Sequence, residues 1–166
     1  MKERTTTCCF TGHRPEKLLW GTDELDARCL ALKETISHAL EGLYEDGFRH
    51  FISGMARGCD LYFGEAVLAL REKYADVTLE AAVPCETQAN GWKKDEKARY
   101  DRLLKCSDKV TYVSRLYSPG CMQRRNKYMV DSSAALLAVF NGTSGGTMQT
   151  ILYARRNSLR IEMIEI

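Results

Sequence analysis

The stretch AALLAVFNGTSGGT (residues 134–147) places a turn rich in glycine, threonine and serine directly behind an apolar run. The run is apolar on both faces, which is typical of a buried strand in a parallel sheet. The turn after it fits three interpretations: a cradle for a phosphate, a nucleophilic serine on a sharp bend, or a polar connection between two elements. The rest of the chain is needed to choose among them.

The same kind of apolar run recurs along the chain. Five further strand-like runs occupy residues 6–11, 48–53, 77–84, 109–114 and 159–166, with helical patterns between them. Such alternation of strand and helix predicts a mostly parallel sheet with helices on both faces. We therefore expect an α/β fold: a single Rossmann-like, three-layer domain over residues 1–166, with a sheet of about six strands.

The first helix is predicted from a stripe of apolar residues at steps of three and four. This stripe runs from Leu25 to Leu43 and would cover one helix face. We expect Thr22 to cap the start of the helix and Gly47 to end it. Further helices are expected around residues 61–68 and over residues 93–106, 120–133 and 146–157.

Composition bears on the class of protein and its compartment. No apolar stretch approaches the roughly 18 residues that span a bilayer, and the first residues lack the apolar core of a signal peptide. The seven cysteines form no CxxC pair, and several fall in apolar patterns, where a reduced cysteine behaves as a small hydrophobe. These features predict a cytoplasmic protein without membrane insertion.

The formal net charge of +2 conceals an uneven distribution. Residues 1–92 hold 10 basic and 15 acidic side chains, whereas residues 91–127 hold 11 basic and 4 acidic ones. A solvated helix face accounts for such a cluster as well as an anion-binding surface does. The sequence leaves both interpretations open.

Three glycine-bearing turns are expected at the same edge of the sheet. They are FTGHRP (residues 10–15), SGMARGCD (residues 53–60) and NGTSGGT (residues 141–147), and each follows a predicted strand. Ligands of open parallel sheets bind in the crevice beyond the carboxyl ends of the strands. One such turn is weak evidence for a site, but three at one edge favour a binding crevice there.

The first turn carries donors beside a glycine. Gly12 lets the backbone approach a ligand, and Thr11, His13 and Arg14 present donor groups. The Arg14 guanidinium can hold a phosphate or carboxylate with two parallel hydrogen bonds. The alternative is an arginine that only forms a surface salt bridge.

The second turn leads into a predicted helix. Gly54 and Gly58 bracket it, and the free N–H groups at the start of a helix favour an anion. Asp60 has two interpretations: it caps the helix or stands in its first turn, or it binds a ribose hydroxyl.

The third turn also matches the GxSxG pattern of serine hydrolases, through Gly142, Ser144 and Gly146. That mechanism requires a histidine after the serine, and all three histidines of this chain precede it. The turn suits a phosphate cradle better, since Thr143, Ser144 and Thr147 add hydroxyls to the exposed N–H groups. No Gly-Lys-Ser/Thr follows, so it is not a Walker loop.

Metal binding and acid–base chemistry have little support in the sequence. The histidines lack HxxxH spacing, and no cluster of cysteine and histidine has zinc spacing, so no metal site is predicted. Asp60 and Asp131, both near strand ends, are the pair that could serve as acid and base. Each also suits a role as a helix cap or ion-pair partner, and no catalytic residue is assigned.

Taken together, the motifs resemble a known family. TGHRP (residues 11–15), SGMARGCD (53–60), RNKYMVDSSAALLAVFNG (125–142) and GGTMQTILYA (145–154) are similar to the YpsA-like family, formerly a domain of unknown function. That family belongs to the SLOG superfamily, with relatives in the DNA-processing protein DprA and the LOG phosphoribohydrolases. The resemblance covers nearly the whole chain.

The resemblance implies a Rossmann-like fold that binds a nucleotide or a nucleotide-derived ligand, such as ADP-ribose or NAD, and a link to bacterial cell division. The ligand contacts it implies are Gly12, His13, Arg14, Ser53, Gly54, Asp60, Asn126, Gly145, Gly146 and Thr147. From their place in the turns, Gly58, Gly142, Thr143 and Ser144 complete the predicted site.

The chain also departs from its hydrolytic relatives. LOG phosphoribohydrolases carry PGGxGTxxE, and its glutamate belongs to the catalytic apparatus, whereas this chain reads SGGTMQT (residues 144–150). Gln149 can form hydrogen bonds but cannot transfer a proton as a carboxylate does. SGMARGCD is close to the SGxARGxD of DprA, which indicates a shared fold and leaves DNA binding open.

Three hypotheses of function follow. The first is a protein that binds or senses a nucleotide-derived small molecule without turnover. The second is a hydrolase that cleaves an N-glycosidic or phosphoester bond in such a ligand. The third is a binder of single-stranded nucleic acid resembling DprA, in which the basic segment and its aromatic side chains supply charge and stacking. Pairing into a homo-oligomer is left open.

Overall fold

Six parallel strands form one sheet in the computed structural model, which describes residues 3–166. In chain order the strands are β1 (Thr7–Thr11), β2 (His50–Ser53), β3 (Thr78–Val83), β4 (Lys109–Tyr112), β5 (Ala135–Phe140) and β6 (Arg160–Glu165). They lie in the order β4-β3-β2-β1-β5-β6, and every neighbouring pair is parallel. The predicted fold class, a Rossmann-like parallel sheet of about six strands, is confirmed.

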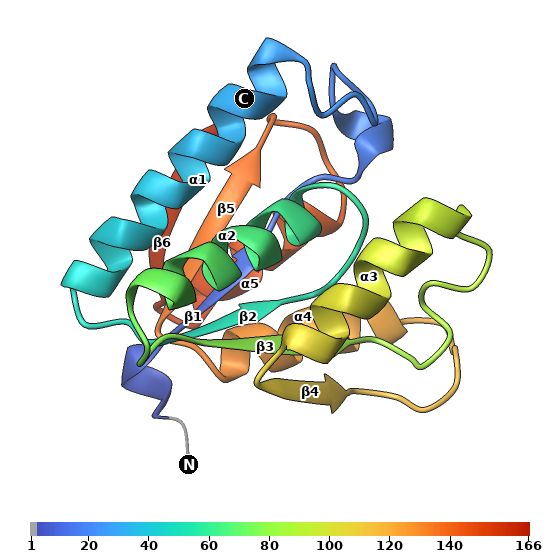
Figure 1. The fold of residues 1–166 in the computed structure, drawn as a ribbon. Helices are drawn as coiled ribbons and strands as arrows, with labels where there is room; N and C mark the ends of the chain where they lie inside the picture. The colour runs from blue at the N-terminus through green and yellow to red at the C-terminus, as the bar shows by residue number, and fades with distance from the viewer. Residues whose placement is uncertain (1–2) are drawn as a thin grey trace.

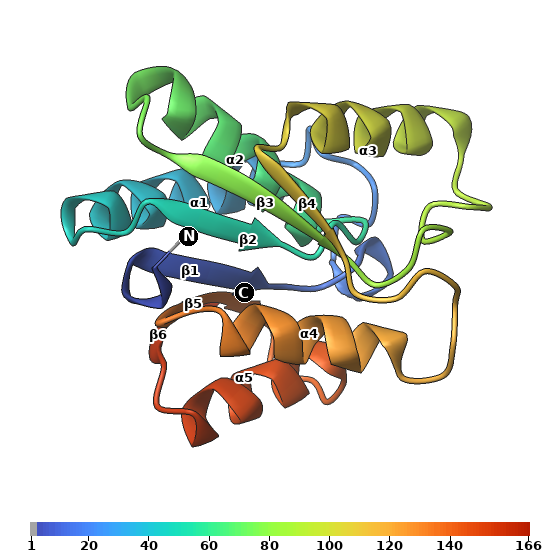
Figure 2. The ribbon, with the colours of Figure 1, turned by 90° about the horizontal axis from the view of Figure 1, so that it is seen from below.

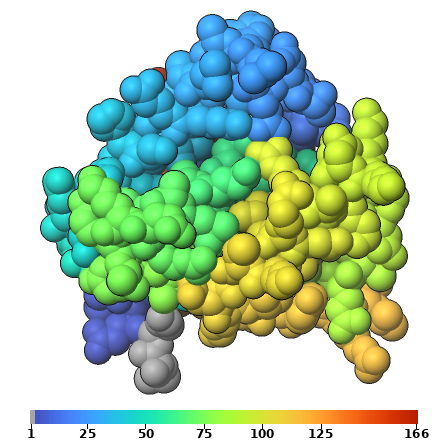
Figure 3. Space-filling model, viewed as in Figure 1, coloured from blue at the N-terminus to red at the C-terminus, as the bar shows by residue number. Residues whose placement is uncertain are grey.

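Five α-helices cover the two faces of this sheet. They are α1 (Ala27–Glu45), α2 (Cys59–Lys73), α3 (Lys94–Cys106), α4 (Cys121–Asp131) and α5 (Gly146–Arg156), with short 3-10 turns η1 (Arg4–Thr6) and η2 (Pro15–Lys17) near the start. Helices α1, α2 and α3 lie on one face, and α4 and α5 lie on the other (Figures 1 and 2). The space-filling view in Figure 3 shows the first three helices closing over their side of the sheet.

Apolar packing on both faces explains why the central strands read as unbroken apolar runs. On the side of α1 and α2, Phe10, Phe51 and Phe63 are fully buried, and the rings of Phe10 and Phe63 stack with centroids 4.6 Å apart. On the side of α4 and α5, Ile52 and Leu136 are fully buried as well. All seven cysteines are free thiols, and only Cys106 among them is exposed.

The first helix starts later than the sequence predicts. It begins at Ala27, where the Asp26 carboxylate accepts a hydrogen bond from the Arg28 N–H at 2.8 Å and caps the helix. Thr22 is therefore not the cap, and Leu25 is 85% exposed instead of packed on the core. The acidic and apolar spacing of residues 22–25 imitates a helical turn, but the chain there forms a separate turn before α1. The predicted end is confirmed, since Gly47 adopts a positive φ of 102° after the last turn.

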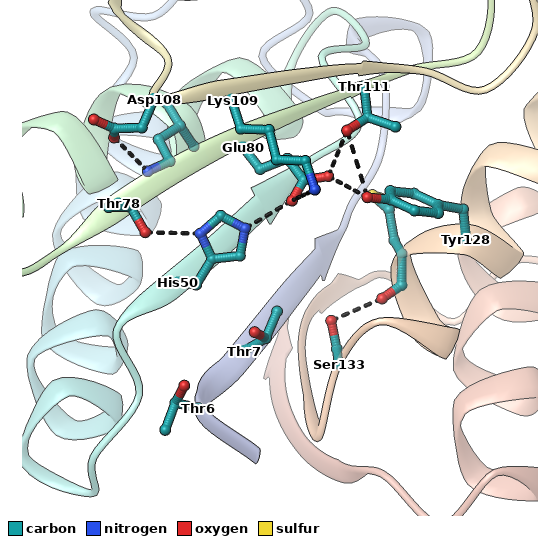
Figure 4. A network of polar contacts seen from close by, with 12 residues as sticks. Thr6, Thr7, His50, Thr78, Glu80, Asp108, Lys109, Thr111, Tyr128 and Ser133 are labelled. Atoms are coloured by element: carbon teal, nitrogen blue, oxygen red, sulfur yellow. Dashed lines mark hydrogen bonds and ion pairs between the residues drawn. The ribbon is translucent and has the colours of Figure 1, made fainter. Parts of the chain in front are cut away.

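A buried polar network joins three strands to α4 (Figure 4). His50 lies between Thr78 and Glu80, with 2.7 Å from Nδ1 to Thr78 Oγ1 and 2.7 Å from Nε2 to Glu80 Oε1. The other Glu80 oxygen accepts hydrogen bonds from Thr111 at 2.9 Å and from Tyr128 at 2.5 Å. Tyr128 belongs to α4, so this network ties that helix to the sheet.

The negative charge of the Glu80 carboxylate is stabilised by this network. Burial acts to raise the pKa of Glu80, but the hydrogen bonds from His50, Tyr128 and Thr111 outweigh it, and the pKa is lowered below its ordinary value. Glu80 is therefore a carboxylate at neutral pH although it is only 2% exposed.

Among residues 3–166, no helix combines the length and apolar character needed to cross a bilayer.

Candidate functional site

The strand order creates a switch point between β1 and β5. From β1 the chain proceeds through β2, β3 and β4 on one side, and then crosses to β5 and β6 on the other. The loops after β1 and β5 therefore diverge to opposite faces and leave a crevice between them. A cavity of about 480 Å³ lies at this point. Its lining comprises Phe10, Thr11, Gly12, His13, Arg14, Glu16, Lys17, Ala56, Asp60, Met122, Arg125, Asn126, Met129, Gly146 and Thr147, and we call it the switch-point cavity.

Two glycines allow the first two turns to meet at one side of the cavity. A Cβ on Gly12 would lie 2.6 Å from the Cβ of Cys59, and one on Gly58 would lie 2.7 Å from the carbonyl oxygen of His13. Gly58 also adopts a positive φ of 84°. The Cys59 N–H then donates to the His13 carbonyl at 3.1 Å. Both glycines are thus required by close packing of the turns.

His13 joins the first turn to the third. Its Nε2 accepts a hydrogen bond from the Asn141 N–H at 3.0 Å, which requires that nitrogen to be unprotonated. Burial lowers the pKa of His13, and the nearby charge of Lys17 lowers it further, so the ring is neutral at pH 7. The Asn141 amide also donates to the Lys17 carbonyl at 3.2 Å. His13 therefore holds the shape of the site.

The third turn presents the start of α5 to the cavity. Gly145 precedes the helix with a φ of 145°, and Gly146 and Thr147, at the helix start, line the cavity. The Lys17 ammonium donates to the Ser144 carbonyl at 2.7 Å and braces the turn. The Thr143 hydroxyl and N–H both donate to the Asn141 side chain, at 2.6 and 3.0 Å, and so are used inside the turn.

A buried arginine forms the wall opposite α5. Arg125 on α4 is 4% exposed, and its guanidinium donates to the carbonyls of Gly54 and Ala82 and, through Nε, to the Asn126 side chain at 2.8 Å. A Cβ on Gly54 would lie 2.7 Å from this guanidinium, so only glycine leaves room for it. Because the network of Figure 4 anchors α4 at Tyr128, it also sets the position of Arg125.

Asp60 stands behind Arg125, in the first turn of α2. Its carboxylate accepts a hydrogen bond from the Ala56 N–H at 3.1 Å, within the turn that precedes the helix. Burial raises the pKa of Asp60, and the Arg125 charge opposes that rise. The Ser53 hydroxyl donates to the Asp60 carbonyl at 2.9 Å and supports the same turn.

Positive charge predominates in the cavity. Arg14, Lys17 and Arg125 line it, against the carboxylates of Glu16 and Asp60. Glu16 is ion-paired with Arg57, and Arg57 does not belong to the cavity lining. Arg14 is exposed, its guanidinium lies 3.9 Å from the Met122 sulfur, and within residues 3–166 it forms no ion pair, although its charge acts to lower the pKa values of Glu16 and Asp60. The cavity thus offers two cationic donors, Arg14 and Lys17, that form no ion pair with a carboxylate of residues 3–166, whereas the Arg125 charge faces Asp60.

The predicted site residues divide into three groups. Those that line the switch-point cavity are Gly12, His13, Arg14, Asp60, Asn126, Gly146 and Thr147. Ser53, Gly54 and Gly58 shape its wall from behind, and Gly142, Thr143, Ser144 and Gly145 form the adjoining turn without lining it. Whether these residues contact a ligand stays a prediction. Asp131 lies apart from the cavity, at the far end of α4, where it accepts a hydrogen bond from Tyr153 at 2.7 Å.

Sequence reasoning missed two cations of the cavity, Lys17 and Arg125. Arg125 directly precedes Asn126 in the RNKYM segment, so its place beside a predicted contact was an available signal. Lys17 follows the first turn by two residues and carries no motif of its own. It reaches the cavity because η2 turns the chain back toward the third turn.

The basic segment of residues 91–127 is partly neutralised within the fold. Arg99 pairs with Glu24 and Glu65, and Lys97 pairs with Asp101. Two of its aromatic residues, Tyr112 and Tyr117, are 50% and 67% exposed, while Tyr100 is buried under Trp92.

Among residues 3–166, no group of three or more histidine, cysteine, aspartate or glutamate side chains could hold a metal ion.

The chain is similar to known proteins along most of its length. The model of the YspA SLOG family matches residues 8–166. The uncharacterised SPbeta prophage-derived protein YoqJ of Bacillus subtilis (strain 168) is 33% identical over 144 residues, covering 78% of this chain and 84% of its own length. A UPF0398 protein of Bacillus thuringiensis (strain Al Hakam) is 29% identical over 155 residues, covering 92% of this chain and 83% of its own length.

Two solved structures share the fold at low sequence identity. DNA processing protein A (DprA) of Streptococcus pneumoniae superposes with a TM-score of 0.61 at 15% identity, over 96% of this chain and 50% of its own. DprA of Helicobacter pylori, described for its single-stranded DNA binding mode, superposes with a TM-score of 0.62 at 13% identity, over 97% of this chain and 65% of its own. The present chain therefore spans one half to two thirds of these proteins.

Proposed function

The chain belongs to the YspA SLOG family, and on this premise we propose that it binds a phosphate-bearing, nucleotide-derived small molecule in the switch-point cavity. The ligand class is that of ADP-ribose, NAD or a mononucleotide. The cavity volume of about 480 Å³ lies within the range of small-molecule sites.

The observation that carries the proposal is the presence of two cations without an ion pair in residues 3–166, Arg14 and Lys17, near the start of a helix. Arg14 and Lys17 approach the cavity from one side, and Gly146 and Thr147 present the first turn of α5 from another. Free N–H groups and the helix dipole add to the attraction of the two cations for an anion. A phosphate bound there accepts hydrogen bonds from both the backbone and the Arg14 guanidinium.

The remaining walls suit the rest of a nucleotide. Met122 and Met129 supply apolar surface, and the side chains of Asn126 and Asp60 supply polar groups near it. Methionine adapts to flat ring systems, and a few fixed polar groups set the orientation of a ligand. A base on the methionines with its phosphate toward α5 uses both sides of the cavity.

Binding without turnover is supported by how the acid–base groups are engaged. His13 accepts the Asn141 N–H, and Glu16 pairs with Arg57. Asp60 accepts the Ala56 N–H and faces Arg125, and Asp131 lies at the far end of α4. Gln149 is exposed and does not line the cavity. General acid–base catalysis requires a group free to exchange a proton with the substrate.

Calorimetric titration with ADP-ribose, NAD and AMP tests the proposal. We expect saturable binding of at least one member, weakened in Arg14→Met and unchanged in Arg102→Met, which removes an exposed arginine outside the cavity lining. Absence of heat for the whole panel would contradict the proposal. Chromatography of the same mixtures after long incubation reports turnover, and intact nucleotide is the expected result.

A hydrolytic function is the second candidate, because one carboxyl group of the cavity has a perturbed pKa. Asp60 lines the cavity with its pKa raised by burial, a property found at many catalytic acids. If Asp60 protonates a leaving group, incubation with nucleoside monophosphates releases free base, and Asp60→Asn abolishes the release. Intact substrate with the wild-type protein would count against this candidate.

Binding of single-stranded nucleic acid is the third candidate. It is favoured by the exposed Tyr112 and Tyr117 within the basic segment of residues 91–127, since bases stack on such rings. Binding to an oligonucleotide would then weaken steeply as salt is raised, and an affinity that does not change with salt would exclude this candidate.

A cytoplasmic location, a link to cell division and pairing into a homo-oligomer stay predictions.

A further inference from the structure

A small hollow adjoins the switch-point cavity and is formed in part by the segment between β3 and α3. This segment leaves the sheet at the carboxyl end of β3 (Figure 2). The hollow has a volume of about 100 Å³, and we call it the side pocket. Three of its residues also line the switch-point cavity, so the two hollows share a wall. The lining of the side pocket comprises Arg14, Ala56 and Met122, which are the shared residues, together with Arg57, Gln88 and Trp92.

Gln88 carries an unpaired acceptor at this pocket. Its Oε1 is the one buried side-chain nitrogen or oxygen without a hydrogen-bond partner among residues 3–166. The Nε2 of the same amide donates to the Gly54 carbonyl at 3.4 Å, and that carbonyl also accepts from the Arg125 guanidinium. The reversed amide would place its oxygen against the Gly54 oxygen, so this contact favours the orientation with Oε1 unpaired. A buried acceptor without a donor is costly, and a donor group that reaches it gains a hydrogen bond.

A small movement of the Gln88 side chain brings this acceptor to the pocket. The residue is partly exposed and lines the pocket, whereas its Oε1 is covered. The contact of 3.4 Å to Gly54 is longer than an ordinary hydrogen bond, so a shift of the amide weakens little. The amide can therefore expose Oε1 while its Nε2 still faces the Gly54 carbonyl.

Size and surface limit what the side pocket accepts. A water molecule takes up about 30 Å³ in the liquid, so the pocket holds about three water-sized groups. It admits the edge of a ring but not a whole nucleoside. Trp92 and Met122 supply apolar surface there, and Trp92 makes an edge-on contact with Tyr100, with ring centroids 5.2 Å apart. Such surface suits the flat edge of a base.

The charges around the side pocket favour a neutral occupant. Arg57 is paired with Glu16 and lies 3.6 Å from a second carboxylate, that of Glu96. The other guanidinium of the lining, Arg14, also faces the switch-point cavity, where it is the proposed phosphate contact. With the Arg57 charge matched, a neutral group that carries a hydrogen-bond donor is the best complement to the Gln88 oxygen.

We propose that the side pocket receives the edge of the nucleotide base and selects a 6-amino group, with Gln88 Oε1 as its acceptor. The inference rests on the proposed nucleotide site and makes Gln88 the residue that distinguishes adenine from hypoxanthine. A base that lies on Met122, the shared wall, extends its edge toward Gln88 and Trp92. Its phosphate remains in the switch-point cavity at the start of α5. Trp92 contributes surface to the base but does not read its exocyclic group.

Nucleotide pairs that exchange the 6-amino donor for a 6-oxo acceptor test the proposal. The pairs are AMP and IMP, NAD and nicotinamide hypoxanthine dinucleotide, and ADP-ribose and its hypoxanthine counterpart. In calorimetric titration of the wild-type protein, we expect the hypoxanthine member to bind at least about tenfold more weakly, because its oxygen faces the Gln88 oxygen. This comparison requires no variant and so does not depend on the stability of one.

Variants assign the preference to Gln88. Gln88→Met keeps the length of the side chain and removes both polar atoms, and should reduce the adenine preference to less than about twofold. Gln123→Met, at an exposed glutamine outside both linings, should retain the preference in full. Trp92→Leu should weaken both members of a pair by about fivefold or more and leave their ratio unchanged, since stacking does not depend on the exocyclic group.

The outcomes separate this inference from the proposed function. Equal binding of both members by the wild type, or an adenine preference that Gln88→Met retains, would overturn the role of Gln88 and leave the nucleotide site in place. A lack of binding by every nucleotide of the three pairs would overturn both. A preference that Trp92→Leu abolishes and Gln88→Met retains would assign the selection to the indole instead.

Discussion

The switch-point cavity and the network around Glu80 both place charged side chains beside the parallel sheet, yet they are built in opposite ways. Around Glu80, each carboxylate oxygen accepts from partners on the neighbouring elements, and His50 is held on both sides (Figure 4). In the cavity, Arg14 and Lys17 keep cationic groups that form no ion pair within residues 3–166.

The contrast separates two uses of polar groups. A satisfied buried network can fix the position of α4 against the sheet, because each member would be left unpaired if the helix moved. Unmatched charges at a cavity contribute little to the fold and leave binding capacity for a ligand. Changes in the first region should therefore reduce stability, and changes in the second should reduce affinity.

The largest effect is expected when the Glu80 network is broken. Glu80→Ala leaves His50, Thr111 and Tyr128 without their common acceptor, and we expect a loss of about 3–5 kcal/mol in the free energy of unfolding, measured by urea denaturation. Glu86→Ala, at an exposed carboxylate, is the matched control and should change stability by less than about 0.5 kcal/mol. A loss under 1 kcal/mol for Glu80→Ala, on the order of an ordinary surface contact, would refute the structural role assigned to the network.

The same network predicts how stability depends on pH. The pKa of Glu80 is lower in the folded protein than its ordinary value, so its contribution is present above that ordinary value. The contribution is lost as pH falls through the lowered pKa of the folded state. Urea denaturation at several acidic pH values should show a loss of stability that is reduced in Glu80→Gln, whose side chain does not titrate.

A smaller effect is expected at the glycines that bring the turns together. Gly58→Ala forces a Cβ to within 2.7 Å of the His13 carbonyl at a positive φ of 84°, and should destabilise the fold by about 1–3 kcal/mol. Gly42→Ala is the matched control, since a Cβ there, inside α1, meets nothing within 4 Å. It should stabilise the protein by about 0.5–1 kcal/mol. Thermal denaturation should show the two melting temperatures moving in opposite directions.

Arg14→Met should reduce ligand affinity and leave stability nearly unchanged, in contrast to Glu80→Ala, which should reduce stability. Because the Arg14 side chain is exposed and unpaired, we expect a change in stability of less than about 0.5 kcal/mol. Its loss should weaken the nucleotide bound most tightly by about tenfold or more, since a hydrogen bond to a charged group contributes about 1.5–3 kcal/mol. Paired calorimetry and denaturation decide the point. An unstable variant with unchanged affinity would place Arg14 with the structural groups.

The smallest effect on stability is expected at His13. This residue shares features of both regions, because it lines the cavity and also joins two turns of the fold. Burial and the Lys17 charge lower its pKa, so an NMR titration should give a midpoint below the ordinary value of about 6.5. For such a group the contribution to stability is present above pH 6.5 and is lost as pH falls through the lowered value. A midpoint above the ordinary value would show that the ring does not accept the Asn141 N–H.

Much of the fold could be predicted from the sequence, and less of the site. The pattern of apolar residues marks most strands and helices to within about two residues, because burial on one or both faces requires apolar side chains at regular positions. The exceptions are the start of α1 and the end of α2, which extends to Lys73 where the sequence indicated a helix around residues 61–68. The start of α1 was misplaced, since residues 22–25 carry helix-like spacing but fold as a turn closed by the Asp26 cap.

The three glycine turns were also found from the sequence alone, and the sheet brings the first and third together at the switch-point cavity. What a turn does within the site was harder to predict. Gly54 and Gly58 are predicted ligand contacts, which stays a prediction, and the structure adds that their missing side chains make room for Arg125 and for the His13 carbonyl. Thr143 looked like a free donor, but its hydroxyl is used by Asn141.

The sequence by itself determined the alternating fold and the edge of the sheet at which polar turns gather, because periodicity and glycine spacing are local properties. Only the tertiary structure decided which side chains meet there. Lys17 reaches Ser144 and Arg125 reaches Gly54 across 127 and 71 residues of sequence, through contacts that depend on how strands and helices pack. The charge of the switch-point cavity follows from these long-range contacts.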